Sequence, residues 1–355
     1  IRIFSGESPN RINSEYDKIP YYKVEQLNWC EKYLGETPYL SQRGKNILPE
    51  GCVVFSKRVA AILTNKVRMN LFPINIDTNL MGIKADNSFI LDQYLFYFIL
   101  RARLNRIADT STIPQINNIH INPITIYVPS LAEQEIITKF LALLDERIAT
   151  QRRLIEDLEK LMSSIVDRIF SDVDGEVVKF RDILEISTQR NDGKADYRIL
   201  SASQEFGMIE RDSLDIDIKA EAKSVKMYKR VHPGDYVLHL RSFQGGLAFA
   251  EVEGICSPAY TILRPNKRLE YGYLKEYFNS SKFIKSLVLV TYGIRDGRSI
   301  NVEEFLDMNI SIHHKNKQAE IVKSLSMLSD KLNVEASILN RYEQQRAYLL
   351  SNLFI

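Results

Sequence analysis

"LAEQEIITKFLALLDERIATQRRLIEDLEKLM", residues 131–162, is the stretch that decides the fold class. Its apolar side chains recur at alternating steps of four and three residues, which is the heptad spacing of a helix that packs along another long helix. Pro129 and Ser130 come directly before it and are typical helix start signals. A second stretch of the same character, "KQAEIVKSLSMLSDKLNVEASILNRYEQQRAYLL", occupies residues 317–350. The sequence therefore predicts two long helices in one chain.

The two stretches are copies of each other. A shift of 184 residues places Gln134 on Gln318, and the helices then align without gaps. The same shift aligns the alternating stretch "INPITIYV" at 121–128 with "FLDMNISI" at 305–312. Such a repeat indicates a duplicated structural unit. We infer that the chain repeats one plan, a strand-rich part followed by a long helix.

The length of the helices favours pairing with each other. About 40 residues at 1.5 Å per residue form a rod of roughly 60 Å. One seam position is polar in both copies, Gln151 in the first and Glu335 in the second, and a polar seam residue can fix helix register. We expect the rods to pair antiparallel and to hold the strand-rich parts apart, related by a pseudo-twofold axis. The alternative is that each helix covers only its own sheet.

Outside the two long helices, several segments have the composition of β-strands and are flanked by turn residues. We predict strands at 51–56, 122–129, 234–240 and 259–263, and shorter helices at 91–102 and 273–287. The predicted fold class is α+β, with two mixed, mainly β domains separated by a long antiparallel two-helix coiled coil and related as an internal repeat. The predicted segments are 1–130 (first domain), 131–171 (central helix), 172–314 (second domain) and 315–355 (distal helix).

Composition is that of an ordinary globular protein in the cytoplasm. The 355 residues carry a net charge of +2, so nucleic-acid binding would have to come from local basic patches, such as 56–58 and 226–230. No apolar run is long enough to span a membrane. Cys30, Cys52 and Cys256 are far apart and odd in number, so we expect reduced, buried thiols. The first residues lack a signal-peptide layout and an initiator Met, so we expect the true start to lie upstream.

Motifs for chemistry are weak. "NPIT" at 122–125 resembles a methyltransferase motif but lies in an alternating apolar stretch without a Gly-rich loop upstream. Acidic residues around 215–223 fit a metal-dependent nuclease only loosely. The adjacent His313 and His314 point apart on an extended segment and are better interpreted as surface residues. Two alternatives stay open from the residues alone, an enzyme fused to a recognition domain and a coiled-coil organiser that binds only protein.

The chain resembles a known family. Its central region is similar to the Pro-x-x-x-Glu-Gln-x-x-Ile pattern, followed by Leu-x-x-Leu-Asp, of the specificity (S) subunits of type I restriction–modification enzymes. The matching residues are Pro129, Glu133, Gln134, Ile137, Leu141, Leu144 and Asp145. "FSGESPN" near the start resembles the opening of a target-recognition domain, and 110–117 and 293–301 resemble closing segments. In the second copy the pattern departs at His313, Lys317 and Ser329.

The resemblance implies a function without chemistry in this chain. Each target-recognition domain of such a subunit reads one half of a bipartite site in double-stranded DNA, and the paired helices set the unread spacer. Two modification subunits dock on the helices and bring S-adenosylmethionine and adenine methylation. A restriction subunit can add ATP- and magnesium-dependent cleavage. We therefore expect no catalytic residue, cofactor or metal in this chain, and no membrane partner.

DNA reading requires side chains that reach base edges and phosphates. The loops after the Pro–Gly turns and before the shared "IN" occupy equivalent places in the two copies. We predict the following DNA-binding residues in these loops: Gln42, Arg43, Lys57, Arg58, Thr110, Ser111 and Thr112 in the first copy, and Arg241, Ser242, Gln244, Tyr292, Arg295 and Arg298 in the second. Arg295 and Arg298 are the strongest candidates for a guanine contact or a phosphate clamp.

Overall fold

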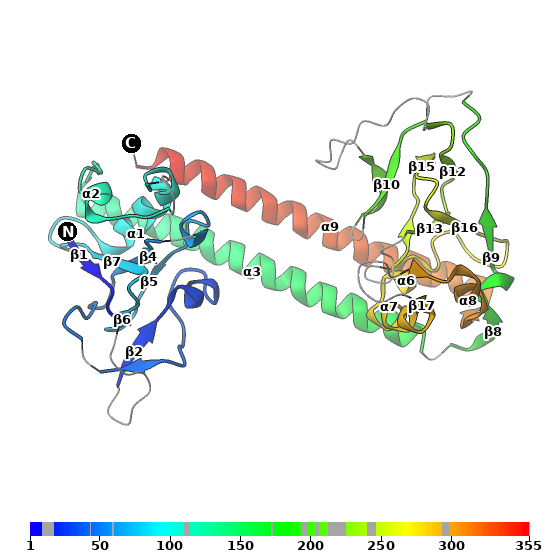
Figure 1. Ribbon diagram of the computed structural model, residues 1–355, viewed down its shortest axis with the longest axis horizontal. Coiled ribbons are helices and arrows are strands. Elements are labelled where there is room, and N and C mark those ends of the chain that lie inside the picture. Colours follow the sequence, from blue (N-terminus) through cyan, green and yellow to red (C-terminus); the bar gives the residue numbers. More distant parts are fainter. Residues whose placement is uncertain are drawn as a thin grey trace. The chain divides into compact units, whose positions relative to one another are not determined.

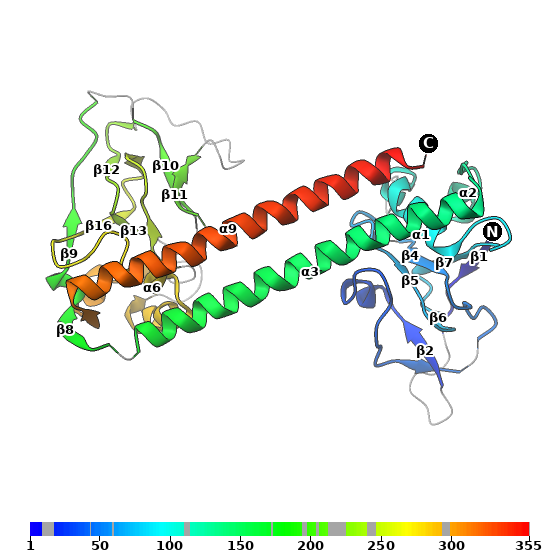
Figure 2. The ribbon, with the colours of Figure 1, turned by 180° about the vertical axis from the view of Figure 1, so that it is seen from behind.

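The chain forms two compact units. The computed structural model describes residues 1–8, 18–42, 44–58, 60–109, 114–171, 173–193, 197–203, 206–211, 225–239, 246–292 and 299–354. Unit 1 comprises Ile1–Arg152 and Ile338–Ile355, and unit 2 comprises Arg153–Ser337. Both long helices contribute to both units, because each helix continues across a unit boundary (Figures 1 and 2).

Unit 1 is a mixed, mainly β domain. Its strands are β1 (Arg2–Ser5), β2 (Ile19–Tyr22), β3 (Leu40–Ser41), β4 (Val53–Ser56), β5 (Val67–Met69), β6 (Asn75–Ile76) and β7 (Leu80–Lys84). Its short helices are η1 (Val24–Asn28), η2 (Ala60–Ile62), α1 (Asp92–Ala102), η3 (Leu104–Arg106) and α2 (Asn118–Ile121). An antiparallel sheet has the strand order β1-β7-β4-β5, and a second sheet, β3-β2-β6, pairs β2 with β6 in parallel.

The core of unit 1 lies between the four-stranded sheet and α1. Six consecutive α1 residues, from Tyr94 to Ile99, are buried, so the helix is covered on nearly every side. Leu141 of the first long helix and Leu350 of the second join this core with Phe55 of β4. The domain and the helices therefore share one hydrophobic core, and the helices are part of the unit.

Unit 2 has the same composition of elements with more and shorter sheets. Its strands are β8 (Gly175–Lys179), β9 (Leu184–Ser187), β10 (Leu200–Ser203), β11 (Gly207–Glu210), β12 (Lys229–Val231), β13 (Tyr236–Leu238), β14 (Ala248–Phe249), β15 (Gly254–Cys256), β16 (Thr261–Pro265), β17 (Thr291–Tyr292), β18 (Ser299–Ile300) and β19 (Asn309–His313). Its short helices are η4 (Phe180–Asp182), α6 (Lys275–Asn279), α7 (Ser281–Ser286), η6 (Leu287–Val290) and α8 (Val302–Asp307). The largest described sheet has the order β14-β13-β16-β9.

Aromatic rings fill the core of unit 2. Phe180 stacks on Phe305 with ring centroids 4.8 Å apart, and Phe278 and Phe283 pack beside them. Aromatic pairs of this kind add stabilisation beyond the area that they bury. Ile321 and Met162, one from each long helix, belong to the same core. Unit 2 is therefore also closed by both helices.

The two long helices, α3 (Leu131–Ile169) and α9 (Lys315–Asn352), pack antiparallel. Within unit 1, α3 residues Asp145 and Arg152 form ion pairs with Arg346 and Glu343 of α9, so the numbering of α9 decreases as that of α3 increases. Within unit 2, Met162 and Val166 of α3 share a core with Ile321 and Leu325 of α9. The predicted α+β class, with two β-rich domains and a long antiparallel helix pair, is confirmed.

A glutamine clamp near the start of each long helix repeats in both copies. The side chain of Gln134 accepts a hydrogen bond from the Leu91 amide (2.8 Å) and donates to the Phe89 and Pro129 carbonyl oxygens (2.8 and 2.9 Å). The side chain of Gln318 accepts from the Glu270 amide (2.8 Å) and donates to the Arg268 and His313 carbonyl oxygens (3.1 and 2.8 Å). Both glutamines are almost fully buried. The duplication inferred from the sequence is thus visible as a repeated set of hydrogen bonds.

An aromatic contact at the end of each long helix repeats as well. Phe354 packs on Tyr94 and Phe98 of α1, with centroids 4.9 and 6.3 Å away. The equivalent Phe170 packs on Tyr273 and Tyr277, at 5.4 and 4.7 Å. These contacts, like the glutamine clamp, align α1 with the 271–279 segment by a shift of 179 residues. The shift that aligns these two segments is therefore five residues smaller than the shift of 184 residues that aligns the long helices.

Three local predictions were wrong, two about secondary structure and one about the burial of His313. Residues 122–129 form no strand, because they have no paired strand among the described residues, although Ile124 and Ile126 still pack on the core. The helix predicted at 273–287 is two helices, since Ser280 is extended and its hydroxyl caps α7 by accepting from the Phe283 amide.

His313 is buried, whereas a surface position was expected. Its ring nitrogen Nδ1 lies 2.6 Å from the Tyr273 hydroxyl, and its backbone amide donates to the same oxygen. Burial, followed by the positive charge of Lys317, lowers the pKa of the His313 ring. His314 is exposed, as expected. Cys52 and Cys256 are buried free thiols and Cys30 is half-buried.

Candidate nucleic-acid interface

Lys57 and Arg58 are the two residues that follow β4. The Lys57 carbonyl oxygen accepts a hydrogen bond from the Ile116 amide (2.8 Å), and Arg58 forms a β-bridge with Gln115. The loop after the first Pro–Gly turn therefore lies beside the segment that carries the first "IN". Two loops that are far apart in the sequence meet at this edge of unit 1.

Charge at this edge is only partly neutralised. Arg58 is exposed, and Lys57 is half-buried. Burial, and then the neighbouring Arg58, lower the pKa of the Lys57 ammonium, while Asp77 opposes the shift. An exposed guanidinium can donate to phosphate oxygens or to the acceptor atoms of guanine.

Gln42 and Lys57 contact opposite ends of the same short segment, residues 75–79. Its carbonyl oxygen accepts a hydrogen bond from the Asn75 side chain (2.8 Å), whereas the Lys57 amide donates to the Asn79 carbonyl oxygen (2.8 Å). The Gln42 side chain is exposed. The structure thus places Gln42, Lys57 and Arg58 in the same region of unit 1.

Most of the predicted DNA-binding residues lie outside the described residues. They are Arg43, Thr110, Ser111, Thr112, Arg241, Ser242, Gln244, Arg295 and Arg298. The strands that flank two of these stretches are described and paired, β13 with β14 and β17 with β18. Tyr292 belongs to β17, where its backbone pairs with Ser299. Two antiparallel strand pairs therefore flank the predicted loops of unit 2.

The basic patch at 226–230 is used largely within the domain. The Lys229 ammonium donates to the Tyr260 carbonyl oxygen (2.6 Å). The Arg230 guanidinium pairs with Glu253 (2.5 Å) and lies over the Tyr197 ring at 4.4 Å. These contacts favour a structural role for Lys229 and Arg230.

Sequence reasoning assigned no role to Gln134 and Gln318, although it aligned them. A large polar residue that recurs at the same heptad position of two otherwise divergent helices was the available signal. The buried Tyr97 and the half-buried Asp145, whose hydroxyl and carboxylate lie 2.7 Å apart, gave no such signal, because the second copy has different residues there.

Comparison with known proteins fits this geometry. A model of the type I restriction modification DNA specificity domain matches residues 2–160. A solved chain described as the type I restriction-modification S subunit from M. genitalium shares 14% identity and a TM-score of 0.58, and the match covers 100% of this chain and 93% of that one. Residues 2–160 therefore match this specificity-domain family, and the fold of the whole chain is similar to that of the solved S subunit.

A second solved chain has a similar fold. It comes from work on complex assembly and conformational transition of the type I R-M system, and it shares 16% identity and a TM-score of 0.60. The match covers 98% of this chain and 92% of that chain. The family model spans the first segment of unit 1 and most of α3, and the likeness to these structures extends the fold over unit 2 and the rest of α9.

In the part of the chain that the structure describes, no group of three or more His, Cys, Asp or Glu side chains is placed to hold a metal ion. No helix within the described ranges is long and apolar enough to cross a membrane.

Proposed function

We propose that this chain is an S subunit of a type I restriction–modification system. Each of its two β-rich domains would read one half of a bipartite DNA site, while α3 and α9 set the unread spacer and dock two modification subunits. The repeated glutamine clamp carries this proposal. Gln134 and Gln318 tie two dissimilar domains to the start of the helix that follows each of them, with the same hydrogen bonds. A constant attachment with variable domains suits a protein that must present two different reading surfaces.

The reading residues that we propose are those predicted from the sequence. Arg58, Lys57 and Gln42 represent the first domain among the described residues, and Tyr292 represents the second. The segments 1–130, 131–171, 172–314 and 315–355 remain our proposed division into two target-recognition domains and two conserved helices. Base contacts would give specificity and phosphate contacts would give position.

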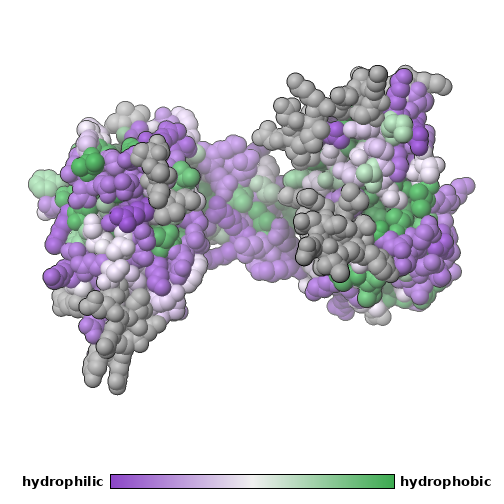
Figure 3. Space-filling model, viewed as in Figure 1, coloured by the Kyte–Doolittle hydropathy of each residue, from purple (hydrophilic) through white to green (hydrophobic). Residues whose placement is uncertain are grey.

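An exposed apolar stripe on α3 supports docking of a protein partner. Ile136, Phe140 and Leu143 are 70%, 47% and 53% exposed, and their spacing places them on one face of the helix. The visible surface of the long helices is otherwise mainly hydrophilic (Figure 3). Exposed apolar side chains in heptad spacing fit a helix of another protein. We assign this stripe to a modification subunit.

The partner subunits would supply the chemistry. S-adenosylmethionine would bind to the modification subunits, and ATP and magnesium would bind to a restriction subunit where one joins. The complex would act on double-stranded DNA in the cytoplasm.

Insertion of one heptad into each long helix tests the proposal. The insertions, placed at matched positions in α3 and α9, should lengthen the spacer of the methylated site and leave both half-sites unchanged. Sequencing of methylated adenines in cells that express the variant with its modification subunits would measure both quantities. Changed half-sites with an unchanged spacer would contradict the ruler role of the helices.

A further inference from the structure

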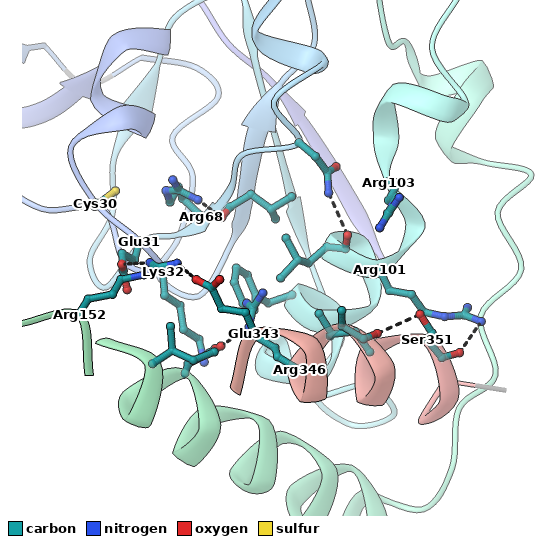
Figure 4. A pocket seen from close by; sticks show the side chains of 18 residues that line it. Cys30, Glu31, Lys32, Arg68, Arg101, Arg103, Arg152, Glu343, Arg346 and Ser351 are labelled. Atoms are coloured by element: carbon teal, nitrogen blue, oxygen red, sulfur yellow. Dashed lines mark hydrogen bonds and ion pairs between the residues drawn. The ribbon is translucent and has the colours of Figure 1, made fainter. Parts of the chain in front are cut away.

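A cavity of about 500 Å³ lies in unit 1, where the domain meets the two long helices. It is lined by α1, β5, the 30–32 segment, α3 and the last turns of α9 (Figure 4). Its apolar lining includes Val67, Leu100 and Leu350. Its charged lining is unbalanced, with six cationic and three acidic side chains: Lys32, Arg68, Arg101, Arg103, Arg152 and Arg346, and Glu31, Asp145 and Glu343.

The three acidic groups are already paired. Arg152 lies 2.6 Å from both Glu31 and Glu343. Arg346 binds Asp145 through its Nε atom at 2.5 Å. The Lys32 ammonium donates to the Tyr97 hydroxyl (3.0 Å), which itself donates to Asp145. The acids therefore offset the cations that lie on their side of the cavity.

Three arginines of the cavity have no carboxylate partner among the described residues. The Arg68 guanidinium donates to the carbonyl oxygens of Leu27 and Val67 (3.0 and 2.8 Å), and Arg101 donates to that of Ser351 (3.4 Å). The side chain of Arg103 is exposed and forms no hydrogen bond or ion pair within the described part of the chain. Backbone carbonyls leave most of the guanidinium hydrogens of such a group open to another acceptor.

The backbone that presents Arg103 is strained. Arg103 has φ 49° and Asn65 has φ 46°, and these are the two non-glycine residues with positive φ among the described residues. Both line this cavity. The Asn65 side chain holds the corner after α1 by donating to the Leu100 carbonyl oxygen (3.0 Å) and accepting from the Leu104 amide (3.1 Å).

Glycine is the usual residue at such a helix end, because a side chain in the left-handed conformation costs free energy. Strain of this kind is retained where the residue has a use. An arginine at this corner places a cation at the mouth of a cavity that already holds two uncompensated cations. This observation is independent of the charge count and points to the same kind of ligand.

We propose that this cavity binds a phosphate group of the DNA backbone, held by Arg68, Arg101 and Arg103; the assignment to DNA rests on the proposed function. Guanidinium groups bind phosphate oxygens in a planar, bidentate geometry. Arg103 is exposed, so a backbone phosphate can meet the cavity at this residue while the rest of the duplex stays outside. The contact carries no base information and positions the first domain on the DNA.

The test uses the S subunit assembled with its modification subunits. Arg103→Gly removes the guanidinium and replaces it with the residue that the backbone prefers, so the fold is retained. Arg101→Ala removes a second contact. Arg106→Ala is the matched control, because Arg106 is an exposed arginine three residues further along that does not line the cavity. DNA affinity is measured by fluorescence anisotropy at several salt concentrations, on the cognate duplex and on a shuffled one.

The Arg101→Ala/Arg103→Gly variant should bind both duplexes on the order of tenfold more weakly, with a salt dependence that is smaller by about one or two phosphate contacts. Arg106→Ala should bind like the wild type. Equal affinities and equal salt dependences for the double variant and the control would overturn the proposal. A loss confined to the cognate duplex would overturn it as well, because that is the signature of a base contact.

Two further measurements separate DNA from other anionic ligands. Inorganic pyrophosphate is titrated into the DNA-free complex. A pyrophosphate-dependent rise in thermal stability that the double variant loses, with unchanged DNA affinity, would contradict the assignment to DNA in favour of a small phosphate ligand. Weaker assembly with the modification subunits, again with unchanged DNA affinity, would contradict it in favour of an acidic protein segment. If the wild-type complex did not prefer its cognate duplex, the proposed function would be contradicted. The cavity proposal would still be tested separately, by the difference in DNA affinity between the double variant and Arg106→Ala.

Discussion

The two junctions between a domain and a long helix share their backbone contacts and differ in the side chains beside them. Gln134 and Gln318 make the same three hydrogen bonds. In the first junction, Lys32, Tyr97 and Asp145 form a connected, half-buried network with Arg346. The two copies have therefore kept the same glutamine hydrogen bonds between domain and helix, while the side chains around them have diverged.

The second junction has a hollow of about 350 Å³ in the equivalent place. By the two registers found in the fold, Tyr97 corresponds to Glu276 and Asp145 to Ser329, and both Glu276 and Ser329 line this hollow. Lys275 beside them pairs with Glu251 (2.7 Å). Both junctions contain open space, but the cavity of the first is basic and crossed by ion pairs, whereas the hollow of the second is acidic. We infer that the second domain is attached chiefly by its clamp and its aromatic core.

The largest effect is expected from the clamps. Gln134→Ala would remove the side-chain partner of one half-buried amide and two carbonyl groups of the backbone, which costs about 2–4 kcal/mol. Gln318→Ala should cost as much, because its geometry is the same. Hydrogen exchange of the amides near Leu91 and Glu270, followed by mass spectrometry, would report the local opening of each junction.

Gln344→Ala provides the control for both variants, because Gln344 is exposed on α9. It should change the local stability by less than about 0.5 kcal/mol. If Gln134→Ala opened its junction much less than Gln318→Ala, the network around Asp145 would be shown to share the attachment. Equal opening would mean that the clamp alone sets it.

The sequence predicted the repeated parts of the structure well, because repetition is readable without coordinates. The heptad seams, the alignment of Gln134 with Gln318 and the helix at 91–102 all follow from periodicity and self-similarity. It failed where a long-range partner decides the outcome. Within the described ranges the alternating stretch 122–129 has no paired strand, and Ser280 interrupts a helical pattern by capping α7.

The candidate site was less predictable for the same reason. Lys57 and Arg58 were identified as polar residues near a turn, but their contact with residues 115–116 depends on the fold of the whole domain. Arg101 and Arg103 were missed, because in the sequence they are ordinary basic residues at the end of a helix. Only the cavity and the left-handed backbone at Arg103 distinguish them.

An intermediate effect is expected on docking, where the two helices also differ. The α3 stripe contains Ile136 and Phe140, whereas the shift of 184 residues places Glu320 and Ser324 at these positions of α9. Phe140→Asp should weaken binding of one modification subunit by about 2 kcal/mol, since it places a charge at an apolar contact. Ser324→Asp, the matched change in the second copy, should have little effect.

Sedimentation of the S subunit with increasing amounts of modification subunit would count the bound copies for each variant. The expected result is that Phe140→Asp reduces the number of tightly bound copies from two to one. Unchanged binding would show that the exposed stripe is not the docking surface. Loss of both copies would show that the two sites do not act separately, and the asymmetry inferred from the helices would then be wrong.

The smallest effect is expected in the hollow of the second junction. Burial raises the pKa of the Glu276 carboxyl, with Lys275 opposing the shift and Glu251 adding to it. A carboxyl group whose pKa is higher in the folded state favours folding when it is protonated, so this contribution to stability is lost as the pH rises from the unfolded-state value through the folded-state value.

Glu276→Gln should therefore stabilise unit 2 at neutral pH, by less than about 1 kcal/mol, and the gain should disappear below the unfolded-state pKa of the carboxyl group. Urea unfolding of the wild type and the variant at pH 4 and pH 7 would measure the difference, with Glu303→Gln as an exposed control on α8. The same gain at both pH values would mean that burial of the charge is not its cause. The hollow would then be a packing difference between the two copies, without the electrostatic cost that now distinguishes it from the ion-paired junction of unit 1.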